Sequence, residues 1–118
     1  MVMRKVYVAG PFRGSDSWVV ERNIREAEVL GFQVAAFGAL PVIPHTMFRF
    51  FNGTLLDQFW LDATTELLRV CDAVVLTARW RDSSGAIGEE REARRLKLPV
   101  FEAPGALEDL AEWIRKGR

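Results

Sequence analysis

The chain alternates short apolar segments with longer segments of helical periodicity, and this alternation restricts the fold more than any other feature. The apolar segments are residues 5–9, 40–43, 73–77 and 99–101, and the helical ones are 18–37, 57–70, 86–96 and 106–116. Strands that alternate with helices pair in parallel, because each helix returns the chain to the same end of the sheet. The sequence therefore predicts one α/β domain over residues 1–118, with a parallel sheet of four to five strands covered on both faces. Residues 46–56 are expected to form an aromatic-rich loop.

The charge balance argues against two classes of partner. The chain has 16 Lys plus Arg and 16 Asp plus Glu, so its formal net charge is zero. Binding to a nucleic-acid polymer or to an anionic membrane normally requires an excess of basic residues. We therefore expect neither partner, and no apolar run approaches the roughly 20 residues that span a bilayer.

The histidine and cysteine content limits metal chemistry. One His and one Cys (Cys71) leave too few ligands for a site built on those residues. A single cysteine also excludes an internal disulfide, which fits a reducing compartment. We expect a cytoplasmic protein with no metal and no cofactor.

Ligands of parallel α/β sheets bind beyond the carboxyl ends of the strands, where the strand order reverses. This rule selects the loop after Ala9 and the loop after Thr77. In the first loop, Gly10 and Gly14 allow a ligand to approach the backbone, and Arg13 could hold a phosphate in a bidentate contact. The alternative is a plain turn with an exposed arginine. Spacing alone favours that alternative, because the loop matches neither glycine-rich nucleotide motif.

The second loop leads into a helix that carries Glu89. At about 100° per residue, Glu89 shares one face with Ala86, Ala93 and Leu96, so it is expected to point inward while Glu90 faces solvent. A carboxylate in the first helical turn is favoured as the anion and can attack a sugar as a nucleophile. The alternative is a carboxylate that only stabilises the helix.

Several motifs occur along the chain in an order that resembles a known superfamily. They are Val6-Tyr7-Val8-Ala9-Gly10-Pro11 with Arg13-Gly14, Pro44-His45, Cys71-Asp72-Ala73-Val74-Val75-Leu76, and Trp80-x-x-Ser83-x-Gly85-x-x-x-Glu89 followed by Leu98-Pro99-Val100. Together they resemble the nucleoside 2-deoxyribosyltransferase-like superfamily, over residues 6–101. The superfamily includes nucleoside deoxyribosyltransferases and nucleoside 5′-monophosphate N-glycosidases.

The resemblance implies a nucleoside 2-deoxyribosyltransferase-like domain with a Rossmann/flavodoxin-like three-layer sandwich. Glu89 matches the nucleophile that attacks the anomeric carbon, and Tyr7 matches the tyrosine that orients it. The remaining matches surround a 5′-phosphate: Gly10, Phe12, Arg13 and Gly14 from the first loop, and Ser83 and Gly85 from the second.

One position departs from the pattern of the superfamily. An aspartate that helps the base to leave is expected eight residues before Asp72, where this chain has Thr64. Asp62 would reach the site only through a local shift of its helix. His45 and a carboxylate from a neighbouring subunit are the other candidates for the acid.

Other residues have a structural alternative beside a binding role. His45 and Trp80 are candidates for substrate contact, yet capping or packing would explain them equally well. Asn23 is expected to be a hydrogen-bonded helix amide. The aromatic residues within 48–60 could stack on a base, and their number predicts a homo-oligomer.

These observations lead to one expected function and two alternatives. We expect an N-glycosidase that cleaves a (deoxy)nucleoside 5′-monophosphate, a small-molecule ligand, through a covalent glycosyl-Glu89 intermediate. A nucleoside 2-deoxyribosyltransferase is the first alternative. A non-catalytic nucleotide-binding module is the second, and Thr64 supports it.

Overall fold

The computed structural model describes residues 2–51 and 53–117, so Asn52 of the expected aromatic loop lies outside the described residues. Within these ranges the chain forms a four-stranded parallel sheet in the order β2-β1-β3-β4. The strands are β1 (Lys5–Ala9), β2 (Leu40–Val42), β3 (Ala73–Leu76) and β4 (Val100–Phe101). The helices are α1 (Ser17–Phe37), α2 (Pro44–Met47), α3 (Asp57–Arg69), α4 (Ser84–Arg95) and α5 (Ala106–Lys116), with a 3₁₀ helix η1 (Trp80–Asp82).

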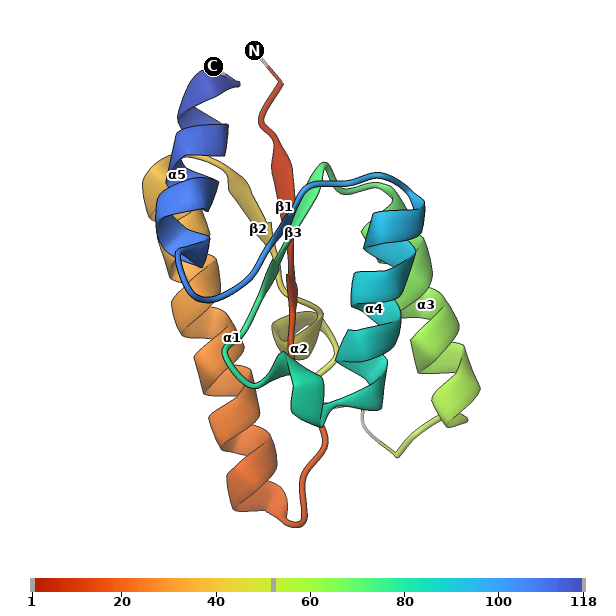
Figure 1. Ribbon diagram of the computed structural model, residues 1–118. Coiled ribbons are helices and arrows are strands. Elements are labelled where there is room, and N and C mark those ends of the chain that lie inside the picture. Colours follow the sequence, from red (N-terminus) through yellow and green to blue (C-terminus); the bar gives the residue numbers. More distant parts are fainter. Residues whose placement is uncertain (1, 52, 118) are drawn as a thin grey trace.

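Helices cover both faces of the sheet, which confirms the predicted three-layer α/β sandwich (Figure 1). Alternate residues of β1 face opposite layers, as the period of a strand requires. Val6 and Val8 pack with α1 and α5, whereas Tyr7 and Ala9 pack with α3 and α4. The apolar run of β1 is thus explained by burial on both sides.

Local signals set the ends of the helices, and they explain two of the differences from the sequence prediction. Asp16 caps α1 by accepting the Val19 amide at 2.9 Å. The expected loop at 46–56 instead begins inside α2, because Pro44 occupies the first helical turn. Helix α4 begins at Ser84 rather than at Ala86, because Ser83 acts as its N-cap.

The strand order reverses between β1 and β3. Helix α1 leads from β1 to β2 on one side, and α4 leads from β3 to β4 on the other. The loop after β1, the helix α2 and the start of α4 gather at the carboxyl end of the sheet (Figure 1). This is the position at which such sheets bind ligands.

None of the helices in the described part of the chain has the length and apolar character needed to cross a membrane.

Candidate active site

A cavity of about 580 Å³ opens at the carboxyl ends of β1 and β3. Its walls differ in character. One wall is largely aromatic and contains Phe12, His45, Phe48 and Trp60. The other is the start of α4, from Ser83 to Glu89. A ligand that fits this cavity has an apolar, flat part and a polar or anionic part.

Packing and hydrogen bonds fix the loop after β1. A Cβ at Gly10 would lie 2.3 Å from Thr77 Oγ1, so a larger residue would displace β1 from the loop after β3. His45 lies beneath this loop, and its Nε2 is 3.0 Å from the Gly10 carbonyl and 3.1 Å from that of Pro11. Because both partners are acceptors, Nε2 carries the proton and donates it to them.

This arrangement defines the role of His45. The ring lines the cavity and is only 5% exposed. Burial lowers its pKa, and the bonds to the two carbonyls oppose that effect only in part. The imidazole is therefore neutral near pH 7 and has no proton to spare at Nε2. His45 organises the loop, and this geometry argues against it as the acid for a leaving group.

Asn23 of α1 holds the next two carbonyls of the same loop. Its Nδ2 donates to Phe12 O and to Arg13 O, each at 3.1 Å. Its Oδ1 accepts from Arg79 Nη2 at 3.1 Å, and Arg79 also pairs with Glu26 at 2.9 Å. The buried amide is satisfied on both sides, as the sequence predicted.

Arg13 lies at the rim of the cavity and already has a partner. Its Nη2 is 2.8 Å from Asp57 Oδ1 at the start of α3, and both side chains are exposed. Gly14 is not among the residues that line the cavity. A Cβ there would lie 2.3 Å from Val19 Cγ1, so the glycine allows the loop to pack against α1.

Glu89 extends from α4 into the cavity wall and accepts a hydrogen bond from the Tyr7 hydroxyl at Oε2. Tyr7 lies behind it on β1 and is fully buried. Glu90 pairs instead with Arg94 on its own helix. The helical period therefore predicted correctly which of the two glutamates lines the cavity, but the expectation that Glu90 faces solvent is wrong, because its side chain is only 13% exposed.

The charge state of Glu89 differs from the sequence expectation. Burial raises the pKa of Glu89 to about 7, although the hydrogen bond from Tyr7 acts in the opposite direction. Because α4 starts at Ser84, Glu89 lies in the second turn, where the helix dipole stabilises an anion less. Glu89 is thus poised between its two protonation states near neutral pH rather than being fully ionised. Burial also raises the pKa of Tyr7 well above its ordinary value, and the charge of Glu89 adds to this.

The N-terminus of α4 offers donors to an anion. Ser83 Oγ accepts the Ala86 amide at 3.1 Å, which leaves the Ser84 and Gly85 amides for a ligand or water. A Cβ at Gly85 would meet nothing closer than Ser83 Oγ at 3.7 Å, so the backbone there is open. Such a terminus favours phosphate or carboxylate groups.

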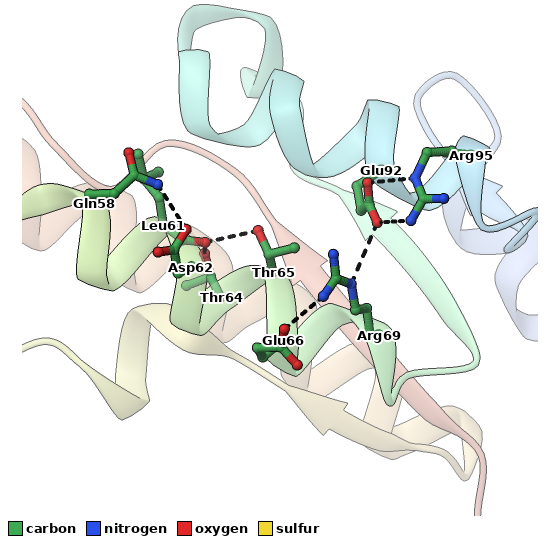
Figure 2. Close-up of polar contacts among 9 residues, drawn as sticks. All are labelled: Gln58, Leu61, Asp62, Thr64, Thr65, Glu66, Arg69, Glu92 and Arg95. Carbon is green, nitrogen blue, oxygen red and sulfur yellow. Dashed lines mark hydrogen bonds and ion pairs between the residues drawn. The ribbon is translucent and has the colours of Figure 1, made fainter.

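The structure does not bring Asp62 or Trp80 to the cavity. Asp62 is exposed on α3 and accepts from Gln58 Nε2 at 2.8 Å, so the helix makes no shift that turns it inward (Figure 2). Thr64 lines the cavity in its place. Trp80 is 8% exposed and packs in the core, with the Arg81 guanidinium 4.6 Å from its ring centre.

Helix α3 is held against α4 by an ion-pair network at the edge of the cavity. Arg69 lies 2.7 Å from Glu66 and 3.7 Å from Glu92, and Glu92 also pairs with Arg95 at 2.6 Å (Figure 2). Glu92 itself lines the cavity. This network fixes the wall that carries Thr64 relative to the wall that carries Glu89.

Sequence reasoning missed three carboxylates of the lining, Asp57, Asp82 and Glu92. Asp82 follows β3 within the second selected loop, so the strand-end rule could have identified it. Asp57 could not be found in that way, because only the packing of α3 brings it near Arg13. Across the described residues, no group of three or more His, Cys, Asp or Glu side chains is placed to hold a metal ion.

The fold and the site together define a Rossmann/flavodoxin-like α/β domain with a ligand cavity at the reversal point of its parallel sheet. The sequence profile of a domain of unknown function, DUF7768, matches residues 4–103, and the chain belongs to this family. No curated protein matches the chain.

Proposed function

We propose that this protein is an N-glycosidase that cleaves a nucleoside 5′-monophosphate into a free base and a sugar 5-phosphate. The observation that carries the proposal is the Tyr7–Glu89 hydrogen bond at the wall of a cavity with one aromatic side. A nucleotide has the two parts that this cavity accommodates. Its base suits the aromatic wall, and its phosphate suits the amides of α4 and the guanidinium of Arg13.

The chemistry follows the pattern of retaining glycosidases. The ionised Glu89 carboxylate attacks the anomeric carbon, and the C–N bond breaks with its electron pair passing to the base nitrogen, which takes up one proton. Water then attacks the anomeric carbon of the glycosyl ester. This second step releases the sugar and the carboxylate, and the water gives up one proton. The net reaction consumes one water molecule for each bond cleaved.

Tyr7 serves this reaction by orienting the carboxylate. Its hydroxyl donates to Oε2, so Oε1 is left to attack. A pKa of about 7 means that roughly half of the molecules hold Glu89 as a carboxylate at neutral pH. The rate of base release is therefore expected to rise as the pH increases through 7.

Phosphate binding requires a rearrangement at the rim. Arg13 pairs with Asp57 at 2.8 Å, and an incoming phosphate would compete with that carboxylate. Exposed pairs of this kind contribute only about 0.2–1 kcal/mol, so a phosphate held also by α4 amides can displace Asp57.

A non-catalytic nucleotide-binding module is the second candidate, and one observation favours it. Thr64 lines the cavity where the superfamily has its aspartate, and Asp62 remains on the outer surface of α3. A protein that binds nucleotides without turning them over would not need a carboxyl group there.

The test is to incubate the protein with ribo- and deoxyribonucleoside 5′-monophosphates and to measure the free base by chromatography. We expect base release by the wild type and by Glu90→Gln, and none by Glu89→Gln. Glu90→Gln is the matched control, because Glu90 pairs outside the cavity with Arg94. If the folded wild type releases no base from any monophosphate, the glycosidase proposal is wrong. If Glu89→Gln still binds nucleotide in that case, the result supports a non-catalytic nucleotide-binding module.

We further propose that the protein is a cytoplasmic homo-oligomer. Support for oligomerisation comes from an apolar surface segment in which Phe50 and Leu56 are each 82% exposed. Exposed patches of this kind usually mark an interface. A monomeric mass by light scattering at micromolar concentration would contradict the oligomer.

A further inference from the structure

Two side chains hold four successive carbonyls of the loop after β1. His45 donates to the first two, and Asn23 Nδ2 donates to the next two, Phe12 O and Arg13 O, at 3.1 Å each. Water has little access to compete for the second pair of bonds, because Asn23 is only 3% exposed. The conformation in which the loop presents Arg13 at the cavity rim therefore depends on which way the Asn23 amide is turned.

Arg79, which follows β3, determines the orientation of this amide. An asparagine side chain donates through its nitrogen and accepts through its oxygen, and a half-turn exchanges the two. A guanidinium group only donates, so Arg79 Nη2, which lies 3.1 Å from Asn23 Oδ1, requires the oxygen on its own side. The amide nitrogen then faces the two loop carbonyls. In the reversed orientation the oxygen would meet those carbonyl oxygens and the nitrogen would meet the guanidinium, so both contacts would be lost.

Arg79 is itself fixed by Glu26, which lies one turn beyond Asn23 on α1. Its Nη2 is 2.9 Å from each oxygen of the Glu26 carboxylate, so a single nitrogen atom makes the contacts to both residues. Neither Arg79 nor Asn23 is among the residues that line the cavity. The two therefore connect the loop after β3 to the loop after β1 from behind the ligand cavity.

We propose that Arg79 is a positioning residue that acts through Asn23 on the loop after β1. By fixing the amide it fixes the carbonyls of Phe12 and Arg13, and so holds the Arg13 side chain where a ligand phosphate can reach it. The effect on ligand binding rests on the proposed function, whereas the effect on the loop does not.

The experiment first measures the order of the loop without any substrate, by limited digestion with trypsin. Trypsin cleaves after Arg13 only when the loop opens, and it cleaves after Arg91, in the middle of α4, only when the helix unfolds. The ratio of the two rates thus separates loop opening from global unfolding. Arg79→Met removes the donors and retains an unbranched side chain. Arg81→Met is the matched control, because Arg81 pairs instead with Glu102 at 3.2 Å.

We expect Arg79→Met to raise this cleavage ratio about three- to tenfold, because cleavage follows the population of the open form and one hydrogen bond changes that population by about this factor. Arg81→Met should retain the wild-type ratio. Arg79→Lys should retain it as well, because an ammonium group can replace the single nitrogen that makes the contacts of Arg79. Asn23→Ala should raise the ratio at least as much as Arg79→Met, and Arg79→Met should add nothing in that background.

The steady-state kinetics of base release provide the second measurement. Arg79→Met should raise KM for a nucleoside 5′-monophosphate by the same factor as the cleavage ratio and leave kcat unchanged. The reason is that the loop contacts the phosphate, whereas the Tyr7–Glu89 pair is untouched. A fall in kcat at constant KM would overturn the proposed effect on the ligand.

A wild-type cleavage ratio in Arg79→Met overturns the inference, as does an undiminished effect of Arg79→Met in the Asn23→Ala background. If Arg79→Met does not fold, Arg79→Ala gives the same comparison. Because the digestion needs no substrate, the two proposals can fail separately. Absence of base release with a raised ratio in Arg79→Met refutes the glycosidase alone. Base release with a wild-type ratio in Arg79→Met refutes this inference alone.

Discussion

Replacing Glu89 with glutamine should change how the stability of the protein depends on pH, whether or not the protein is an enzyme. The side chain is partly buried, and burial raises its pKa from an ordinary 4.5 to about 7 in the folded state. The folded state therefore binds a proton more tightly than the unfolded chain does. The stabilisation from this proton is complete below pH 4.5 and is lost as the pH rises towards 7 and above.

The magnitude follows from the two pKa values. A difference of roughly 2.5 pH units corresponds to about 3 kcal/mol in the free energy of unfolding, at about 1.4 kcal/mol per unit. Glutamine has nearly the same shape and never ionises, so Glu89→Gln should lack this loss. Relative to the wild type, the variant should become more stable by about 3 kcal/mol as the pH is raised from 4 to 8.

The measurement is urea denaturation at intervals between pH 4 and 8, followed by circular dichroism. His45 changes the free energy of unfolding with pH in the opposite direction. Burial lowers the pKa of His45, so the stability that its neutral form provides is lost as the pH falls. That contribution is common to both proteins and cancels in their difference. Glu90→Gln, on the same helix but paired with Arg94, should follow the wild-type curve. A difference between wild type and Glu89→Gln that stays flat with pH would refute the buried-carboxyl argument.

Two further predictions concern the neighbours of the site. Tyr7→Phe removes a hydrogen bond to a charged group, worth about 1.5–3 kcal/mol, so the pKa of Glu89 should rise by about one to two pH units. Base release at pH 7 should then fall about five- to fifty-fold and recover at higher pH, and a pH profile that keeps its wild-type midpoint would contradict this. Asp57→Asn frees Arg13 from an exposed ion pair and should tighten binding of a nucleoside 5′-monophosphate about two- to five-fold by calorimetry. The unphosphorylated nucleoside serves as the control, and an equal gain for it would show that Arg13 does not contact the phosphate.

The sequence by itself determined the architecture and the direction of the main side chains. Alternating apolar and helical segments were sufficient to predict the parallel sheet, because that signal is repeated in every segment of the chain. The helical period placed Glu89 at the cavity, and the strand-end rule selected both loops that line it. These features depend on spacing along the chain, which a sequence displays directly. The same period did not predict that the Glu90 side chain is largely buried beside Arg94.

Only the tertiary structure decided the electrostatics and the contacts of the site. Tyr7 and Glu89 are 82 positions apart, and their separation in space depends on how β1 and α4 pack. The pKa of Glu89, the pairing of Arg13 with Asp57 and the burial of Trp80 in the core likewise arise between distant segments. Desolvation and ion pairing depend on every group that lies nearby in space. No local pattern in the sequence shows which groups those are.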